Sequence, residues 1–315
     1  MRIISFATKD SDWKSPRMGI LVYANGRDTG ERLDCEKLFP PSERPSNSLD
    51  WFDMDGRWFR RARETASRLG ADANALAEAR RSGWLVPSQD AYWFAPVPRP
   101  GKIVCIGLNY HDHAREIGMA VPKSPTIFSK FPSCVVGPGE PVVIPPSSEQ
   151  VDFEAELAVV IGRRASRVSA ADAYEYVLGY TAFNDVTARD FQFSDVQWQR
   201  GKSCDTFAPM GQTIVTTDEI PDPHSLRITL TINGVLMQDS NTSQLIFRVP
   251  EIIEFVSSSI TLEPGDVIAT GTPPGVGMGR KPPVFLKPGD QMEVAIEKIG
   301  GLGNPIAAAD GARGG

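Results

Sequence analysis

Residues 151–162 read VDFEAELAVVIG, a stretch that alternates apolar and acidic side chains before it becomes continuously apolar. Successive side chains of a strand point to opposite faces, so the alternation predicts a β-strand. One face carries Phe153, Ala155, Leu157, Val159 and Ile161, and the opposite face carries Asp152, Glu154 and Glu156. Three carboxylates on one face repel one another, and burial makes each costly to ionise without a counter-charge.

Solvent, basic residues or a metal must compensate the charge of this acidic face, and the residues alone leave the choice open. A charged strand face commonly lies in water at a sheet edge. Alternatively, a hard divalent cation such as Mg²⁺, Mn²⁺ or Ca²⁺ compensates the charge, because such ions prefer carboxylate oxygens whereas zinc prefers nitrogen and sulfur. Asp185, in YTAFNDVTARDFQ, is either a third carboxylate ligand or a turn aspartate.

Further strand-like runs occur on both sides of this stretch. They are IVCIG (103–107), LRITLTING (226–234), GDVIATG (265–271) and DQMEVAIEKIG (290–300). Asn233-Gly234 predicts a type I′ hairpin turn. Helices are expected over 60–81, over 169–179 from a Ser169 N-cap to Gly179, and over 250–260 with Pro250 at the first position. Because strands and helices do not alternate regularly, the pattern predicts an α+β fold with a mixed, mainly β core.

The length of 315 residues suits a large domain plus a smaller one. Pro96, Pro98 and Pro100 impose an extended linker, so we expect a small N-terminal domain with linker over 1–95 and a catalytic domain over 96–306. The tail 307–315 has little to bury and is expected to be flexible.

Composition excludes several classes of partner. The net charge of −6 without a basic block argues against nucleic acid. No apolar run is long enough for a signal peptide or a membrane span, so the expected location is cytoplasmic. The four cysteines form no C-x-x-C pair, which indicates reduced and mostly buried thiols.

The segment GLNYHDHAREIG (107–118) contains two of the three histidines. His113 and Glu116 are three residues apart and share one face of a helix, so Glu116 can orient His113 as a general base. The plainer interpretation is a polar helix start capped by Asn109; His224, between prolines, is interpreted as a turn residue. Lys202 offers an ammonium for an anion, and Thr272 begins an irregular Gly/Pro loop that lacks the P-loop spacing.

Taken in order, NYHDHAREIG, PTIFSKFPS, VDFEAELAVVIG, NDVTARDFQ, GKSCDTFAPMG and GDVIATGTPPGVG closely resemble the fumarylacetoacetate hydrolase family. The resemblance spans about 96–306 and is strongest to the family's domain-containing protein 2 type. It implies a mixed β-roll catalytic domain, a homodimer, and Mg²⁺ or Mn²⁺ held by Glu154, Glu156 and Asp185. It makes Asp152 a supporting residue rather than a ligand.

The same resemblance assigns catalytic roles to His113, Glu116 and Lys202. It places Lys130, Arg189, Gln192 and Thr272 around the substrate or the metal. One departure concerns Ile106, which occupies the position of a further acidic ligand in the founding hydrolase. The site therefore resembles that of the family's shorter members, which include decarboxylases and isomerases.

The expected function is metal-dependent hydrolysis of a carbon–carbon bond in a 2,4-diketo acid, with a small keto acid as the substrate. His113 would activate water, and Lys202 would stabilise the expelled enolate. An alternative is decarboxylation or keto–enol isomerisation of a small keto acid such as oxaloacetate, because these reactions share the enolate. A non-catalytic metabolite-binding protein is the remote alternative.

Overall fold

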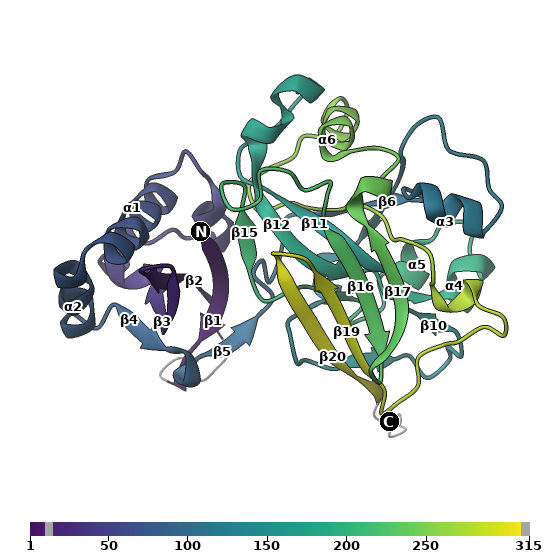
Figure 1. Cartoon of the computed structure of the whole chain (residues 1–315), viewed down its shortest axis with the longest axis horizontal. Coiled ribbons are helices and arrows are strands. Elements are labelled where there is room, and N and C mark those ends of the chain that lie inside the picture. The colour runs from purple at the N-terminus through teal and green to yellow at the C-terminus, as the bar shows by residue number, and fades with distance from the viewer. Residues whose placement is uncertain (10–14, 310–315) are drawn as a thin grey trace.

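The computed structural model describes residues 1–9 and 15–309, and one long sheet runs through it (Figure 1). Its strand order is β4-β3-β2-β1-β15-β12-β11-β18-β6-β7, with β5 paired to β1. The strands on the catalytic side are β6 (Ile103–Gly107), β7 (Thr126–Lys130), β11 (Ala155–Ile161), β12 (Val177–Asn184), β15 (Ile214–Thr216) and β18 (Val267–Ala269). Those on the N-terminal side are β1 (Arg2–Ala7), β2 (Arg17–Ala24), β3 (Arg27–Asp34), β4 (Leu85–Pro87) and β5 (Tyr92–Phe94).

A second sheet packs against the first in the order β17-β16-β19-β20-β9 (Figure 1). Its strands are β9 (Val142–Ile144), β16 (Arg227–Ile232), β17 (Val235–Asn241), β19 (Gln291–Ile296) and β20 (Gly300–Ala308). The short pairs are β10 (Val151–Asp152) with β13 (Thr187–Ala188), and β8 (Val135–Val136) with β14 (Ala208–Pro209).

Helices are few and lie at the margins of the sheets. They are α1 (Arg57–Ala71), α2 (Ala73–Arg81), α3 (His111–Glu116), α4 (Arg189–Ser194), α5 (Gln199–Lys202) and α6 (Val249–Ser257). The longest 3₁₀ helix is η7 (Ala170–Tyr176), and shorter ones are η2 (Cys35–Leu38), η3 (Pro41–Glu43), η4 (Ser48–Phe52), η5 (Ser88–Asp90), η6 (Pro132–Cys134), η8 (Thr242–Gln244) and η9 (Gly277–Gly279). The predicted α+β fold with a mixed, mainly β core is confirmed. In the described part of the chain, every helix is too short or too polar to cross a bilayer.

The alternating stretch 151–162 forms strands β10 and β11, as predicted, but both faces of these strands are buried. Phe153, Leu157 and Val159 belong to one hydrophobic cluster with the second sheet, whereas Ala158 and Val160 belong to another with the N-terminal strands. The acidic face therefore does not lie in water at a sheet edge. The free energy of burying its carboxylates must be offset within the protein.

Local predictions are confirmed where they depend on neighbouring residues. Asn233 and Gly234 have φ angles of 52° and 76° and join β16 to β17, as a type I′ turn requires. The helical stretch 60–81 forms α1 and α2. Helix α6 begins near Pro250, as predicted.

The predicted helix over 169–179 is wrong in its second half. Only Ala170–Tyr176 is helical, as a 3₁₀ helix, and the following residues enter β12. Gly179 does not end a helix. A Cβ at this position would lie 2.3 Å from the Val215 carbonyl oxygen of β15, so Gly179 permits a close approach of two strands.

The predicted domain boundary near residue 95 lies within a continuous sheet. β1 pairs with β15, which joins segment 1–95 to segment 96–306 through backbone hydrogen bonds. Strand β20 extends to Ala308 and pairs with β9, so it includes the first two residues of the predicted tail. Residues 310–315 of that tail lie outside the described residues.

Candidate active site

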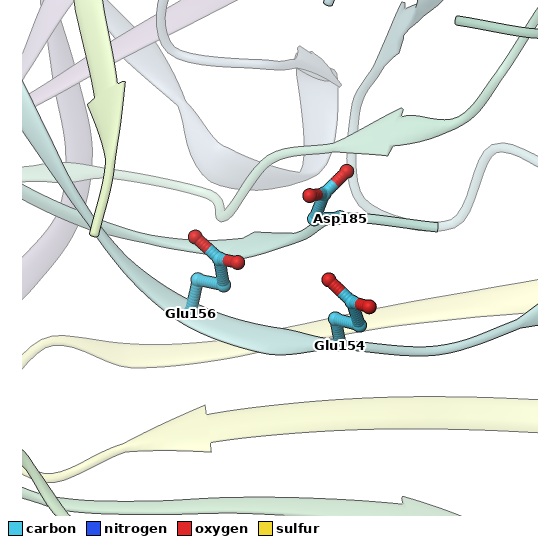
Figure 2. A group of neighbouring side chains, drawn as sticks. All are labelled: Glu154, Glu156 and Asp185. Atoms are coloured by element: carbon cyan, nitrogen blue, oxygen red, sulfur yellow. The ribbon is translucent and has the colours of Figure 1, made fainter. Parts of the chain in front are cut away.

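Three carboxylates converge at one end of the β11–β12 pair (Figure 2). One ligand atom from each of Glu154, Glu156 and Asp185 lies within 4.8 Å of the others. The strand register explains the convergence, because β11 pairs antiparallel with β12 and Ala155 lies opposite Asn184. Asp185, the next residue, donates its N–H to the Glu154 carbonyl at 2.9 Å. This cluster contains the three residues predicted to hold a metal.

Buried cations compensate two of the three carboxylates. Lys202 Nζ donates to Glu154 Oε2 at 2.8 Å and to Asp185 Oδ2 at 2.7 Å. Lys130 Nζ donates to Asp185 Oδ1 at 2.6 Å, and Arg189 Nη2 donates to Glu154 Oε1. Burial alone would raise the pKa of Glu154, but Lys202 and Arg189 outweigh it and lower that pKa to about 2.

Glu156 has a different environment from its two neighbours. Its side-chain Oε2 accepts the Gly271 N–H at 2.8 Å, and within the described residues it forms no salt bridge. Burial, and then the negative charges of Asp185 and Glu154, raise the pKa of Glu156 well above its usual range. This carboxyl is therefore the one whose charge lacks a direct counter-ion.

The donor set fits a hard divalent cation. Four buried carboxylates and three buried cationic side chains lie together here. The carboxylates are those of Asp152, Glu154, Glu156 and Asp185, and the cations are those of Lys130, Arg189 and Lys202. One negative charge remains uncompensated, and every candidate ligand atom is an oxygen, as Mg²⁺ and Mn²⁺ prefer. Ile106, buried on β6, contributes an apolar side chain, so the cluster has three carboxylates.

The predicted histidine–glutamate pair is formed on α3. His113 Nδ1 lies 2.9 Å from Glu116 Oε2, and the His113 side chain is 13% exposed. A carboxylate can only accept, so Nδ1 carries the proton of the neutral ring and Nε2 is the basic nitrogen. Asn109 is not the N-cap of α3; that position is Tyr110. The Asn109 Oδ1 instead accepts the Phe247 N–H at 2.8 Å, and its NH2 group donates to the carbonyls of Phe247 and Thr270.

The Gly/Pro loop, residues 270–280, connects this pair to the carboxylates. At its start the Gly271 N–H binds Glu156, and further along the Gly275 N–H donates to Glu116 Oε1 at 3.0 Å. Thr272 Oγ1 accepts from Gln238 Nε2 at 2.9 Å. The loop thus touches both a predicted metal ligand and the partner of the predicted base.

The remaining predicted residues form hydrogen bonds with neighbouring side chains. Gln192 Oε1 accepts from Arg189 Nη1 at 3.0 Å, and Lys130 is bound to Asp185. Gln238, which the sequence analysis missed, donates to Thr272 and accepts the Ala155 N–H at 2.9 Å. A buried glutamine on an otherwise exposed hairpin strand is recognisable only with the structure. The catalytic and substrate-binding roles of all these residues stay predictions.

The sheets form a mixed β fold, and the buried carboxylates lie at one end of its β11–β12 pair. The chain belongs to the fumarylacetoacetate hydrolase family of enzymes, because the family model described as "Fumarylacetoacetate (FAA) hydrolase C-terminal" matches residues 102–307. A solved structure, the fumarylacetoacetate hydrolase from Exiguobacterium antarcticum, is 35% identical with a TM-score of 0.77, and the match covers 98% of this chain and all of that one.

Two relatives carry a more specific name. Oxaloacetate tautomerase FAHD2B, mitochondrial, from Bos taurus is 51% identical over 224 residues, which are 70% of this chain and 71% of the relative. Oxaloacetate tautomerase fahd2, mitochondrial, from Xenopus laevis is 42% identical over 308 residues, which are 97% of this chain and 90% of the relative. The resemblance to the domain-containing protein 2 type is confirmed.

These relatives contradict the expected hydrolysis of a 2,4-diketo acid, because they are named as tautomerases. The residues of the site alone do not distinguish the two reactions. Both reactions pass through an enolate. A histidine–glutamate pair that can take a proton from water can also take one from a carbon atom of the substrate. The alternative of keto–enol isomerisation agrees better with the relatives.

Proposed function

We propose that the protein interconverts the keto and enol forms of oxaloacetate with Mg²⁺ or Mn²⁺ bound at Glu154, Glu156 and Asp185. The names of the relatives support this substrate. The observation that carries the proposal in this chain is the loop contact between the two parts of the site. Gly271 binds the carboxylate cluster and Gly275 binds the proton-transfer pair.

His113 is the proton carrier in this proposal. Tautomerisation moves one proton from C3 of the keto acid to the C2 oxygen, and it needs no water and no bond cleavage between carbons. The Nε2 atom of His113 takes the C3 proton, and the imidazolium then returns a proton to oxygen or to carbon. Glu116 holds the Nδ1–H and stabilises the positive charge during the step.

Charge on the oxygen is stabilised by the chain's own buried cations. A divalent cation bound at the cluster would supply Lewis-acid polarisation of the keto oxygen. Lys202 is bound to both Glu154 and Asp185, and it presents an ammonium next to the site where charge develops. Preorganised groups of this kind contribute about 10²–10³-fold to a rate.

The test is a rate measurement with purified protein and Mg²⁺, with the decay of enol oxaloacetate followed by ultraviolet absorbance. Acylpyruvates and CO₂ release are followed in parallel. We expect fast enol–keto interconversion, with no pyruvate from acylpyruvates. Release of CO₂ at the rate of enol loss would show a decarboxylase and contradict the proposal.

His113→Gln and His111→Gln form the matched pair of variants. His111 begins the same helix and is exposed. We expect His113→Gln to lose at least about 10²-fold in kcat, the usual contribution of a general base. His111→Gln should keep the wild-type rate. Equal rates in both variants would remove His113 as the proton carrier.

We also propose that the protein is a homodimer. Large apolar side chains are exposed around α4 and after β7: Phe193 is 63% exposed, Val196 is 97% exposed and Phe131 is 54% exposed. Sedimentation velocity should give a dimer for the wild type and a smaller species for Val196→Asp. A wild-type monomer at micromolar concentration would contradict this.

The cytoplasmic location stays a prediction, and the names of the two relatives place those proteins in mitochondria. Fractionation of cells that express the tagged full chain decides it. Recovery with mitochondria would contradict the cytoplasmic prediction.

A further inference from the structure

Asp152 is the buried carboxylate of the acidic strand that is not a candidate metal ligand. Both of its oxygens are used twice. Oδ1 accepts the N–H of Phe153 at 2.8 Å and of Gly277 at 2.6 Å. Oδ2 accepts the N–H of Met278 at 3.0 Å and Nε of Arg189 at 2.9 Å. Four donors fill the acceptor capacity of one carboxylate.

On one side these contacts lead to the carboxylate cluster. The Arg189 guanidinium that binds Asp152 through Nε also binds Glu154 through Nη2. Its third contact is Gln192. Asp152 therefore helps to fix the orientation of the planar guanidinium whose Nη2 atom binds Glu154.

On the other side the contacts lead to the proton-transfer pair. Gly277 and Met278 are at the end of loop 270–280, and Gly275 of the same loop donates to Glu116. The loop fits only with glycine at position 277. A Cβ there would lie 1.9 Å from the Val284 carbonyl oxygen and 2.6 Å from Asp152 Oδ1.

We propose that Asp152 is a positioning residue that couples the His113–Glu116 pair to the carboxylate cluster. It holds loop 270–280 and Arg189 in one arrangement, so the geometry at Glu116 and the geometry at Glu154 depend on each other. Such coupling is reciprocal: a cation bound at the cluster orders the loop, and an ordered loop strengthens cation binding. The inference rests on the proposed function only in giving His113 a catalytic task.

The test compares Asp152→Asn with Asp266→Asn. Asp266 is an equally buried carboxylate that accepts two backbone N–H groups, of Lys102 and Glu263, and binds one basic side chain, Lys102. It has the same kind of contacts as Asp152, but none with loop 270–280. Asparagine keeps the shape of each residue and removes the charge and one acceptor.

Hydrogen–deuterium exchange with and without Mg²⁺ is the first readout, and calorimetric Mg²⁺ titration is the second. In Asp152→Asn we expect exchange at least about tenfold faster in 271–280 and in 111–116, the factor for losing a hydrogen bond to a charged group. Mg²⁺ should bind about 10–100-fold more weakly. In the wild type, Mg²⁺ should slow exchange in both segments, and Asp266→Asn should behave like the wild type in both.

Gly277→Ala is the second variant, because it displaces the loop while leaving every charge in place. It should reproduce the faster exchange in 111–116. The proposal is overturned if exchange rises only around 277–278, if Mg²⁺ affinity is unchanged in Asp152→Asn, or if Asp266→Asn gives the same pattern. A wild type without tautomerase activity would contradict the proposed function alone, since exchange and Mg²⁺ binding are measured without turnover.

Discussion

The Nζ atom of Lys202 lies 2.7 Å from Oδ2 of Asp185, inside the group of carboxylates that fits a divalent cation. The same ammonium binds Glu154. A buried lysine at this point keeps the acidic residues ionised, and it also competes with a cation for their oxygens.

Lys202→Met should separate cation binding from catalysis. Loss of the ammonium removes a repulsive charge, so Mg²⁺ should bind at least as tightly as in the wild type. The rate of tautomerisation should fall about 10²–10³-fold. Calorimetry and the enol assay measure the two effects. Lys102→Met, which breaks the ion pair between a partly exposed lysine and buried Asp266, controls for loss of the cationic partner of a buried carboxylate and should keep the wild-type kcat. Weaker Mg²⁺ binding in Lys202→Met would be contrary to this account.

Glu156→Gln should leave the stability of the metal-free protein equal or higher, and it should reduce the stabilisation that Mg²⁺ gives. Burial and two like charges raise the pKa of Glu156, so the neutral amide removes an unfavourable charge from the metal-free protein. In EDTA, the Tm of the variant should equal or exceed that of the wild type. With Mg²⁺ at 100 times the wild-type Kd, the wild type should gain about 2.7 kcal/mol and the variant much less. Equal gains would show that Glu156 is not a ligand.

Stability should fall at acid pH partly through His224. Its Nε2 accepts the Val249 N–H at the start of α6 at 3.1 Å, and burial, followed by the charge of Arg248, lowers its pKa below the usual value. The unfolded chain then binds a proton more readily, so stability is lost as pH falls from about 6.5 toward the folded pKa.

Replacement of His224 by Gln should flatten the dependence of unfolding free energy on pH between about 7 and 5, the range around the ordinary histidine pKa. Urea unfolding at a series of pH values measures it. His111→Gln, with an exposed ring, should retain the wild-type slope. An unchanged slope in His224→Gln would assign the acid sensitivity to other groups.

Much of the fold could be predicted from sequence, because the relevant patterns are local. The assignment of Glu154, Glu156 and Asp185 as candidate metal ligands follows from the family resemblance, since the residues alone leave the acidic face open. Alternation in 151–162 places Glu154 and Glu156 on one face, and the spacing of His113 and Glu116 places both on one side of a helix turn. The turn at Asn233-Gly234 depends only on φ angles that these residues adopt easily.

The missed features depend on contacts between distant segments. Residues 177–179 have a helical pattern, but pairing with β11 and β15 outweighs that preference. Asn109 could cap α3, yet its Oδ1, the atom that would cap, accepts the N–H of Phe247, which is more than a hundred residues away in the chain. His224 forms the predicted turn and also caps α6, which no spacing in the sequence indicates.

An anomalous difference map from crystals grown with Mn²⁺ tests whether Glu154, Glu156 and Asp185 hold one cation together. We predict one peak bonded to a carboxylate oxygen of each of Glu154, Glu156 and Asp185, at about 2.2 Å, close to the distances of hard cations to oxygen. A peak elsewhere, with Glu154 and Asp185 still bound by Lys130, Arg189 and Lys202 and Glu156 by the Gly271 N–H, would show that the three carboxylates do not share a cation.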